Sequence, residues 1–331
     1  MSIAAVILAA GKGTRFKSAR AKVLHPLLGR PMVKYPLDVV RRFKVEPLVV
    51  IVGHQAEAVK AACRAEGVKF VLQAEQKGTG HAVACAARAL AGFSGDVLIL
   101  PADAPLIKAE TIEALIAAHR RSGTTTVSFT WAKQDDPTGY GRIVRGAIGF
   151  TIVEDKDADP SEKLIKEVNV GLYLVKADYL FEALKDVKSD NAQGEYYLPD
   201  IVNLARTKGA RCRAFEARDP EEVLGVNDRA QLAQAERRLR RDLVKSLMQS
   251  GVTCQDPAAV YIDWGVKIGE DTELGAGGHL LGRTAVGQGV VIEPGCYLRD
   301  VVVGDGARIR FGCRLEGVRV EPNQTVETAQ K

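Results

Sequence analysis

The chain has 331 residues, of which 46% are hydrophobic and 26% are charged, and it carries a formal net charge of +5. This is the composition of an ordinary globular protein that is long enough for two domains. Because the Lys and Arg residues are scattered among nearly as many Asp and Glu residues, the charge does not indicate a nucleic-acid-binding surface, although it suits a basic cleft for anionic substrates.

The first apolar run, residues 3–10, is too short to span a bilayer and has no basic segment before it, and no longer apolar run follows. The six cysteines form no C-x-x-C pair of the kind that indicates a zinc site. We therefore expect a cytoplasmic protein with free thiols and no membrane partner.

Up to residue 121, short apolar runs alternate with helical patterns. The strand-like runs are continuously apolar, as expected for strands that are buried on both faces. Strands that alternate with helices of this length predict right-handed crossovers and a largely parallel sheet covered on both sides, which is a Rossmann-like, doubly wound α/β fold. The predicted strands are residues 4–9, 47–52, 69–72 and 96–100, and the predicted helices are residues 33–43, 55–65, 80–90 and 110–121.

From residue 124 onwards the pattern shifts toward strands, and a long helix follows. The predicted strands are residues 124–131, 141–144, 150–154 and 168–174, and the predicted helices are residues 177–184, 198–208 and 231–249. The arginines of the last helix are compatible with membrane or RNA contact, but a solvated helix that joins two domains is the favoured interpretation. We expect a first domain over residues 1–229, a linker helix over 230–250 and a second domain over 251–331.

In the second domain an aliphatic residue recurs at every sixth position. A period of six is neither helical nor a simple strand alternation. It is typical of a hexapeptide-repeat β-helix, in which each coil of three short strands stacks on the next. We expect a short left-handed parallel β-helix of about four coils that packs side by side in a homotrimer. The series runs through Ile262, Ile268, Leu274, Leu280, Val286, Ile292 and Leu298, slips by one residue to Val303, Ile309 and Leu315, and slips again to Val320 and Val326.

The strongest local motif is LAAGKGTR, which directly follows the first predicted strand. Gly11 and Gly13 let the backbone pass close to an anion, and the N–H groups there, with Lys12 and Arg15, can cradle phosphates. The dinucleotide-binding fingerprint would need a third glycine where Phe16 stands, and the P-loop pattern is absent. A tight turn between a strand and a helix would explain the glycines but not the flanking cations.

Three further positions are candidates for nucleotide and metal binding. Lys22, together with Arg15, can place two positive charges on a triphosphate. Asp103 follows the fourth predicted strand, at the strand ends where doubly wound folds bind ligands, and a lone carboxylate there suits Mg²⁺; capping of the next helix is the alternative. The Gln73 amide can contact a nucleobase edge, and Gly78 in the QKGTGHA segment allows close backbone approach, although GTG also marks a simple turn.

Taken together, these motifs resemble a known family. In chain order they are LAAGKGTR, AKVLHPLLGRPM, LQAEQKGTGHA, DDPTGYGRI, VEDKDA, NAQGEYYLPDIV and GVNDR. They are similar to those of the bacterial N-acetylglucosamine-1-phosphate uridyltransferases, which form the N-terminal half of a bifunctional enzyme. The resemblance covers residues 3–249 and implies a nucleotidyltransferase fold for the first domain.

The resemblance also implies roles for individual residues. Leu8, Ala10, Gly11, Gln73, Gly78 and Thr79 would hold the uridine nucleotide, and Gly13 belongs to the same phosphate-binding turn. Arg15 and Lys22 would be the catalytic cations, Asp103 and Asn227 would bind Mg²⁺, and Gly141, Glu154 and Asn169 would contact the amino sugar. Asn169 and Asn227 rest on the resemblance alone.

The implied reaction is the attack of N-acetylglucosamine-1-phosphate on UTP, which gives UDP-N-acetylglucosamine and pyrophosphate. The chain departs from the family pattern in two places. Pro101 and Ala102 stand where the family has Tyr-Gly, and residues 251–331 hold no counterpart of the motifs of the family's acetyltransferase site. We therefore expect no acetyltransferase activity. Two alternatives are transfer of a uridylyl or thymidylyl group to another sugar 1-phosphate, and a non-catalytic trimeric scaffold that binds a sugar nucleotide.

Overall fold

The computed structural model describes residues 2–65, 67–146, 149–205 and 207–327. The chain forms two compact units, of which the first comprises residues 1–25 and 31–229 and the second comprises residues 26–30 and 230–331. Within the described residues, no helix has the length and apolar character needed to cross a bilayer.

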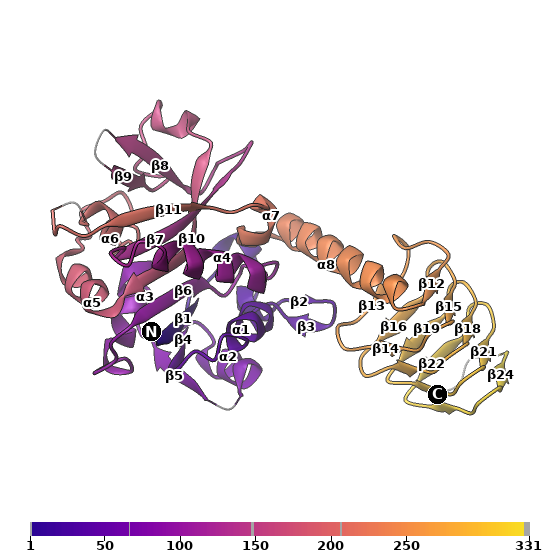
Figure 1. Cartoon of the computed structure of the whole chain (residues 1–331). Helices are drawn as coiled ribbons and strands as arrows, with labels where there is room; N and C mark the ends of the chain where they lie inside the picture. Colours follow the sequence, from indigo (N-terminus) through magenta and orange to yellow (C-terminus); the bar gives the residue numbers. More distant parts are fainter. Residues whose placement is uncertain (1, 66, 147–148, 206, 328–331) are drawn as a thin grey trace. The chain divides into compact units, whose positions relative to one another are not determined.

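A single mixed sheet forms the centre of the first unit (Figure 1). Its strand order is β11-β7-β10-β6-β1-β4-β5, and β8 and β9 form a hairpin that joins the sheet at β10. The strands are β1 (Ile3–Ala9), β4 (Leu48–Val52), β5 (Val68–Leu72), β6 (Asp96–Pro101), β7 (Val127–Lys133), β8 (Gly141–Gly146), β9 (Gly149–Val153), β10 (Glu167–Lys176) and β11 (Cys212–Glu216).

Helices cover both faces of this sheet. Alternate residues of β1 point to opposite faces, so Ala5 and Ile7 join the core under α1, α2, α4 and α7, whereas Ala4 and Val6 join the core under α3, α5 and α6. The doubly wound α/β fold is thereby confirmed. The helices are α1 (Lys34–Arg41), α2 (Ala56–Cys63), α3 (Thr79–Cys85), α4 (Ala109–Arg120), α5 (Ala177–Asp186), α6 (Asp200–Asn203) and α7 (Pro220–Val223).

Several predicted elements differ from the structure. The sheet is parallel from β6 to β5, but β10 runs antiparallel to both β6 and β7. The predicted helix 198–208 is reduced to the single turn of α6, and residue 206 lies outside the described part. The predicted helix 80–90 ends at Cys85 and continues as a 3₁₀ turn, Ala86–Arg88. Strand β11 and helix α7 escaped prediction because both are short and lack a clear apolar period.

The second unit begins with α8 (Arg229–Gln249), whose first residue still belongs to the first unit, and continues as a β-helix. Short strands stack into three parallel sheets, with the orders β12-β15-β18-β21-β24, β13-β16-β19-β22 and β14-β17-β20-β23. The strands are β12 (Thr253–Cys254), β13 (Tyr261–Ile262), β14 (Lys267–Ile268), β15 (Glu273–Leu274), β16 (His279–Leu281), β17 (Ala285–Val286), β18 (Val291–Ile292), β19 (Tyr297–Arg299), β20 (Val302–Val303), β21 (Arg308–Ile309), β22 (Arg314–Glu316), β23 (Arg319–Val320) and β24 (Thr325–Val326).

The aliphatic series fills the interior of this β-helix. Leu280, Leu298 and Leu315 lie in register on successive coils and are fully buried. Both slips in the period occur at the corner after this sheet, where the chain turns through a left-handed residue, Asp300 with φ +54° at the first slip and Gly317 with φ +64° at the second. The hexapeptide prediction is confirmed, and the stacking is consistent with a left-handed β-helix.

An unpredicted hairpin contributes residues 26–30 to the second unit, whereas Pro31 at its end belongs to the first. Strands β2 (Pro26–Leu27) and β3 (Arg30–Pro31) pair with each other, and the Leu28 carbonyl accepts a hydrogen bond from the Trp264 N–H at 2.8 Å. The Arg30 guanidinium lies 5.3 Å from the centre of the Trp264 ring, within cation–π range. The first and second units are therefore interleaved in sequence.

Candidate active site

The glycine-rich turn after β1 is shaped by its contact with Lys22. Gly13 has φ +62° and caps the 3₁₀ turn Thr14–Phe16. A Cβ at Gly13 would lie 2.5 Å from the Cβ of Lys22, so only glycine lets the turn approach that residue. Phe16 is 1% exposed and anchors the turn in the protein. The two cation-bearing motifs are thus packed against each other.

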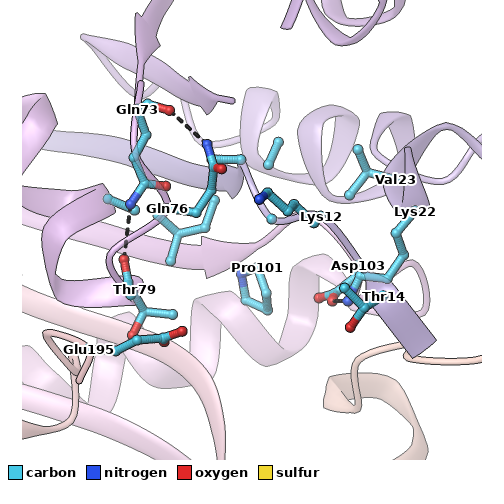
Figure 2. A pocket seen from close by; sticks show the side chains of 17 residues that line it. Lys12, Thr14, Lys22, Val23, Gln73, Gln76, Thr79, Pro101, Asp103 and Glu195 are labelled. Carbon is cyan, nitrogen blue, oxygen red and sulfur yellow. Dashed lines mark hydrogen bonds and ion pairs between the residues drawn. The ribbon is translucent and has the colours of Figure 1, made fainter. Parts of the chain in front are cut away.

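A cavity of about 540 Å³, hereafter the large cavity, opens at the carboxyl ends of β1 and β6. Its volume lies in the usual range for small-molecule sites. Figure 2 shows Gln73, Gln76 and Thr79 at one end and Asp103, Lys22 and Thr14 at the other. All seven residues predicted to bind the nucleotide line this cavity, namely Leu8, Ala10, Gly11, Gly13, Gln73, Gly78 and Thr79.

At the Gln73 end, the QKGTGHA and NAQGEYY segments pack together. Gly78 has φ +103°, and a Cβ there would lie 2.5 Å from the Tyr196 carbonyl oxygen. The Leu198 N–H donates to the Thr79 hydroxyl at 3.0 Å. The Gln73 amide nitrogen donates to the Gly78 carbonyl at 3.1 Å and lies 3.0 Å from His81 Nδ1. With both N–H groups of the amide directed at these partners, the Gln73 amide oxygen is the atom left to contact a ligand.

At the opposite end, Asp103 and Asn227 converge on one cation. The Lys22 ammonium forms an ion pair with Asp103 Oδ2 and lies 3.2 Å from Asn227 Oδ1. The backbone supports this arrangement, since the Val226 N–H donates to the Asp103 carbonyl at 2.8 Å and the Asn227 amide donates to the Gly225 carbonyl at 3.1 Å. The Asp103 and Lys22 side chains are only 17% and 14% exposed, so their charges are poorly screened by solvent.

The same two oxygens suit a divalent cation. Asp103 Oδ2 and Asn227 Oδ1 approach a single point that Lys22 Nζ now fills. No group of three or more His, Cys, Asp or Glu side chains with metal-binding geometry occurs among the described residues. One carboxylate and one amide oxygen match the ligand set of Mg²⁺, which takes few protein oxygens and completes its shell with phosphate and water.

A second cavity of about 250 Å³, hereafter the small cavity, adjoins the first. Leu8, Thr79, Pro101 and Asp103 line both cavities, so the two form one continuous cleft. The lining of the small cavity also includes the predicted sugar-contact residues Gly141, Glu154 and Asn169, together with Arg15 and Asn227. Arg15 Nη1 would lie 3.3 Å from a Cβ at Gly139, which places its guanidinium beside the DPTGYGRI segment.

Glu154 sits in an unfavourable environment for a negative charge. Burial, followed by the carboxylates of Asp200, Asp157, Asp155 and Glu195, raises the pKa of Glu154 to about 7. Arg142 is 2% exposed and offsets part of this charge, since its guanidinium donates to Asp155 Oδ1 at 2.9 Å and to the Tyr140 carbonyl. Near neutral pH, Glu154 is therefore present both as a hydrogen-bond donor and as an acceptor.

Sequence reasoning missed some residues of this cleft. Tyr140 lies in the small cavity, and burial and the Asp103 carboxylate raise its pKa to about 12, which keeps the phenol protonated. Gln76 and Glu195 line the large cavity. All three lie in motifs that carry the family resemblance, DPTGYGRI, QKGTGHA and NAQGEYY. The motif pattern contained a signal for them, but their convergence on the cleft depends on the fold.

Comparison with known proteins identifies the family. A model described as the MobA-like NTP transferase domain matches residues 5–170. The bifunctional protein GlmU of Pelobacter propionicus is 49% identical over 318 residues, which cover 95% of this chain and 69% of the relative. GlmU of Geobacter sulfurreducens is 50% identical over 301 residues, which cover 90% of this chain and 63% of the relative. GlmU of Exiguobacterium sibiricum is 48% identical over 308 residues, which cover 92% of this chain and 68% of the relative. The chain spans roughly two thirds of the length of these relatives and belongs to the GlmU family of bacterial N-acetylglucosamine-1-phosphate uridyltransferases.

Proposed function

We propose that this sugar-1-phosphate nucleotidyltransferase couples UTP to N-acetylglucosamine-1-phosphate with Mg²⁺ as its divalent metal. The observation that carries the proposal is the meeting of the two cavities at Asp103. A nucleoside triphosphate in the large cavity and a sugar phosphate in the small cavity would place their reacting phosphates beside Asp103, Asn227 and the cations.

The reaction requires positioning and charge neutralisation rather than a covalent enzyme intermediate. A phosphate oxygen of the sugar phosphate forms a bond to the α-phosphorus of UTP, while the bond from that phosphorus to the bridging oxygen breaks and pyrophosphate leaves. Arg15 and Lys22 would stabilise the negative charge on the phosphates, and the N–H groups around Gly11 and Gly13 would orient them. Bound to Asp103 and Asn227, Mg²⁺ would supply further charge neutralisation.

Lys22 would play two successive parts in this scheme. Without substrates, its ammonium holds Asp103 and Asn227 together. Asp103 and Asn227 would hold Mg²⁺, and Lys22 would then contact the phosphates, since an ammonium and a divalent cation repel each other. The mutual ion pair thus keeps the carboxylate and the amide oriented before substrates arrive.

Pyrophosphate release tests the proposed substrates. With UTP, Mg²⁺ and N-acetylglucosamine-1-phosphate, we expect rapid release that depends on both substrates and stops with a chelator. The second candidate, another sugar 1-phosphate, is motivated by Pro101, which lines both cavities where the family pattern has tyrosine. Glucose- and galactose-1-phosphate, each with UTP or dTTP, form the comparison panel. Faster release with a sugar that lacks the acetamido group would favour the second candidate.

We propose further that residues 251–331 lack an acetyltransferase site, since the motifs of that site have no counterpart there. Incubation with acetyl-CoA and glucosamine-1-phosphate is expected to release no coenzyme A thiol. Thiol release that depends on glucosamine-1-phosphate would contradict this proposal. We also propose that the protein acts in the cytoplasm, where UTP is available, and as a homotrimer.

A further inference from the structure

The Tyr173 hydroxyl is buried in the wall of the small cavity without a hydrogen-bond partner. Tyr173 is 1% exposed. Three other buried side-chain atoms within the described residues also lack a partner, but their residues line neither cavity. Buried polar groups in native proteins are nearly always paired, so this hydroxyl is a candidate for a hydrogen bond that forms when the adjoining cavity is occupied.

Strand β10 brings Tyr173 and Asn169 to the same cavity. The pairing of β10 with β7 shifts in register between these two residues, and Gly171 between them has φ +77°. Tyr173 lies opposite Ile99 on β6, and a Cβ at Gly171 would lie 3.7 Å from the Cγ of Pro101. This irregularity places the Tyr173 side chain in the wall that Pro101 also lines, where the family pattern would have supplied a tyrosine.

Two polar side chains act on the Tyr173 hydroxyl. Burial and then the Glu154 carboxylate raise the pKa of Tyr173, whereas the Asn169 side chain lowers it. The phenol therefore keeps its proton and remains a donor. Asn169 Oδ1 accepts from the Gly171 N–H at 3.4 Å, so the Asn169 amide nitrogen is the atom that can donate to the phenol oxygen, while the phenol O–H can donate to a carboxylate. Tyr173 is thus flanked by one donor and one acceptor.

We propose that Tyr173 is a positioning residue of the sugar site, whose hydroxyl donates to the Glu154 carboxylate and accepts from the Asn169 amide when the sugar phosphate binds. This inference rests on the proposed function, because it assigns Glu154 and Asn169 to the sugar. Hydrogen bonds in active sites are often incomplete before the substrate arrives and tighten in the complex. The hydroxyl at position 173 would orient both contact residues in a chain whose residue 101 has no hydroxyl.

The variant Tyr173→Phe removes this hydroxyl and keeps the ring. A hydrogen bond to a charged group typically changes affinity by about tenfold or more. We therefore expect KM for N-acetylglucosamine-1-phosphate to rise about tenfold, while KM for UTP and kcat stay within about twofold. The free variant should unfold at the same or a higher temperature than the wild type, because it loses no bond. Tyr179→Phe is the matched control, since that hydroxyl donates to the Ile201 carbonyl and does not line the small cavity.

A double-mutant cycle with Glu154→Ala separates positioning from general packing. If Tyr173 acts through Glu154, its substitution should lower kcat/KM less than about threefold in the Glu154→Ala background. An unchanged sugar KM in Tyr173→Phe, losses that add fully in the double variant, or a lower unfolding temperature of the free variant would each overturn the inference. A wild-type protein that releases no pyrophosphate would instead contradict the proposed function.

Discussion

At the scale of single residues, the cations and most of the carboxylates of the cleft belong to different segments. Lys12, Arg15 and Lys22 lie on or beside the glycine-rich turn, with Arg15 also lining the small cavity, whereas the carboxylates that act on Glu154 lie around the small cavity, apart from Glu195, which lines the large one. Phosphates are drawn to the cations. The carboxylates around Glu154 suit a sugar ring without a negative charge, because they would repel a sugar that carries a carboxylate. Substitution of a cation should therefore affect catalysis, whereas substitution of Glu154 should affect how stability depends on pH.

The substitution Arg15→Ala removes a cation that the proposed mechanism places on the phosphates. By comparison with other phosphoryl-transfer enzymes, we expect kcat/KM to fall by about 10³-fold or more. Arg20→Ala is the control, since Arg20 is an exposed cation on the same loop and lines neither cavity. Near-normal turnover of Arg15→Ala in the pyrophosphate assay would contradict the assigned role.

Glu154 should make the stability of the protein depend on pH. The pKa of its carboxyl is raised from 4.5 to about 7 in the folded protein. Between these pH values the folded state holds a proton that the unfolded chain has lost, so stability falls as the pH rises through this window, by at most about 3 kcal/mol. The pKa of Asp200 is also raised, mainly by burial, and acts in the same direction.

The variant Glu154→Gln isolates this contribution. It cannot ionise, so the decline in stability between pH 4.5 and pH 7 should become shallower, and the remaining decline should include the contribution of Asp200. Urea unfolding at several pH values in this range measures the effect. A slope identical to that of the wild type would show that Glu154 has an ordinary pKa.

At the scale of elements, the active-site segments are held by close backbone contacts. The QKGTGHA turn lies against the NAQGEYY segment, and the glycine-rich turn lies against Lys22. The first contact joins segments that are far apart in sequence, whereas the second joins residues of neighbouring segments. Both contacts explain why glycine is needed at positions 13 and 78.

Gly78→Ala tests the first of these contacts. The added Cβ would lie 2.5 Å from the Tyr196 carbonyl oxygen, at a φ of +103°. Gly92→Ala is the matched control, because its φ is +76° and nothing lies within 4 Å of the added carbon. The control should cost about 1–2 kcal/mol of backbone strain. Gly78→Ala should cost at least about 2 kcal/mol more and raise KM for UTP, as measured by urea unfolding and kinetics. Equal losses in the two variants would show that the contact is easily relieved.

At the scale of the whole molecule, the β-helix carries a ladder of outward-facing side chains. Tyr261, His279 and Tyr297 lie in register on successive coils, with ring centres 4.6 Å and 6.1 Å apart, and Arg314 follows them. Trp264 and Phe311 are 49% and 74% exposed. Large exposed aromatic side chains of this kind favour contact with another protein surface.

We expect the protein to be a trimer in solution. Side-by-side packing of β-helices would bury part of the exposed aromatic surface described above. Light scattering coupled to gel filtration should give three times the mass of the chain over a wide range of concentrations. A mass equal to one chain at micromolar concentration would contradict the expectation.

The amino-acid pattern alone predicted the elements that depend on local burial. Continuous apolar runs indicated β1, β4 and β6, and the six-residue period indicated the β-helix, because each pattern repeats along a single stretch of chain. The glycine-rich turn and Asp103 were predicted because each follows a predicted strand, and Lys22 was predicted as a second cation beside Arg15. The family resemblance added Asn169 and Asn227, and membership of that family argues against a non-catalytic scaffold.

Only the tertiary structure decided which distant residues meet. The antiparallel direction of β10, the convergence of Asp103 and Asn227 on Lys22, and the unpaired hydroxyl of Tyr173 all depend on strands and loops that are separated by many residues. Local periodicity records which face of an element is buried, but it does not record the partner that buries it. The raised pKa of Glu154 also depends on the tertiary structure, because it arises from burial and from carboxylates on several segments.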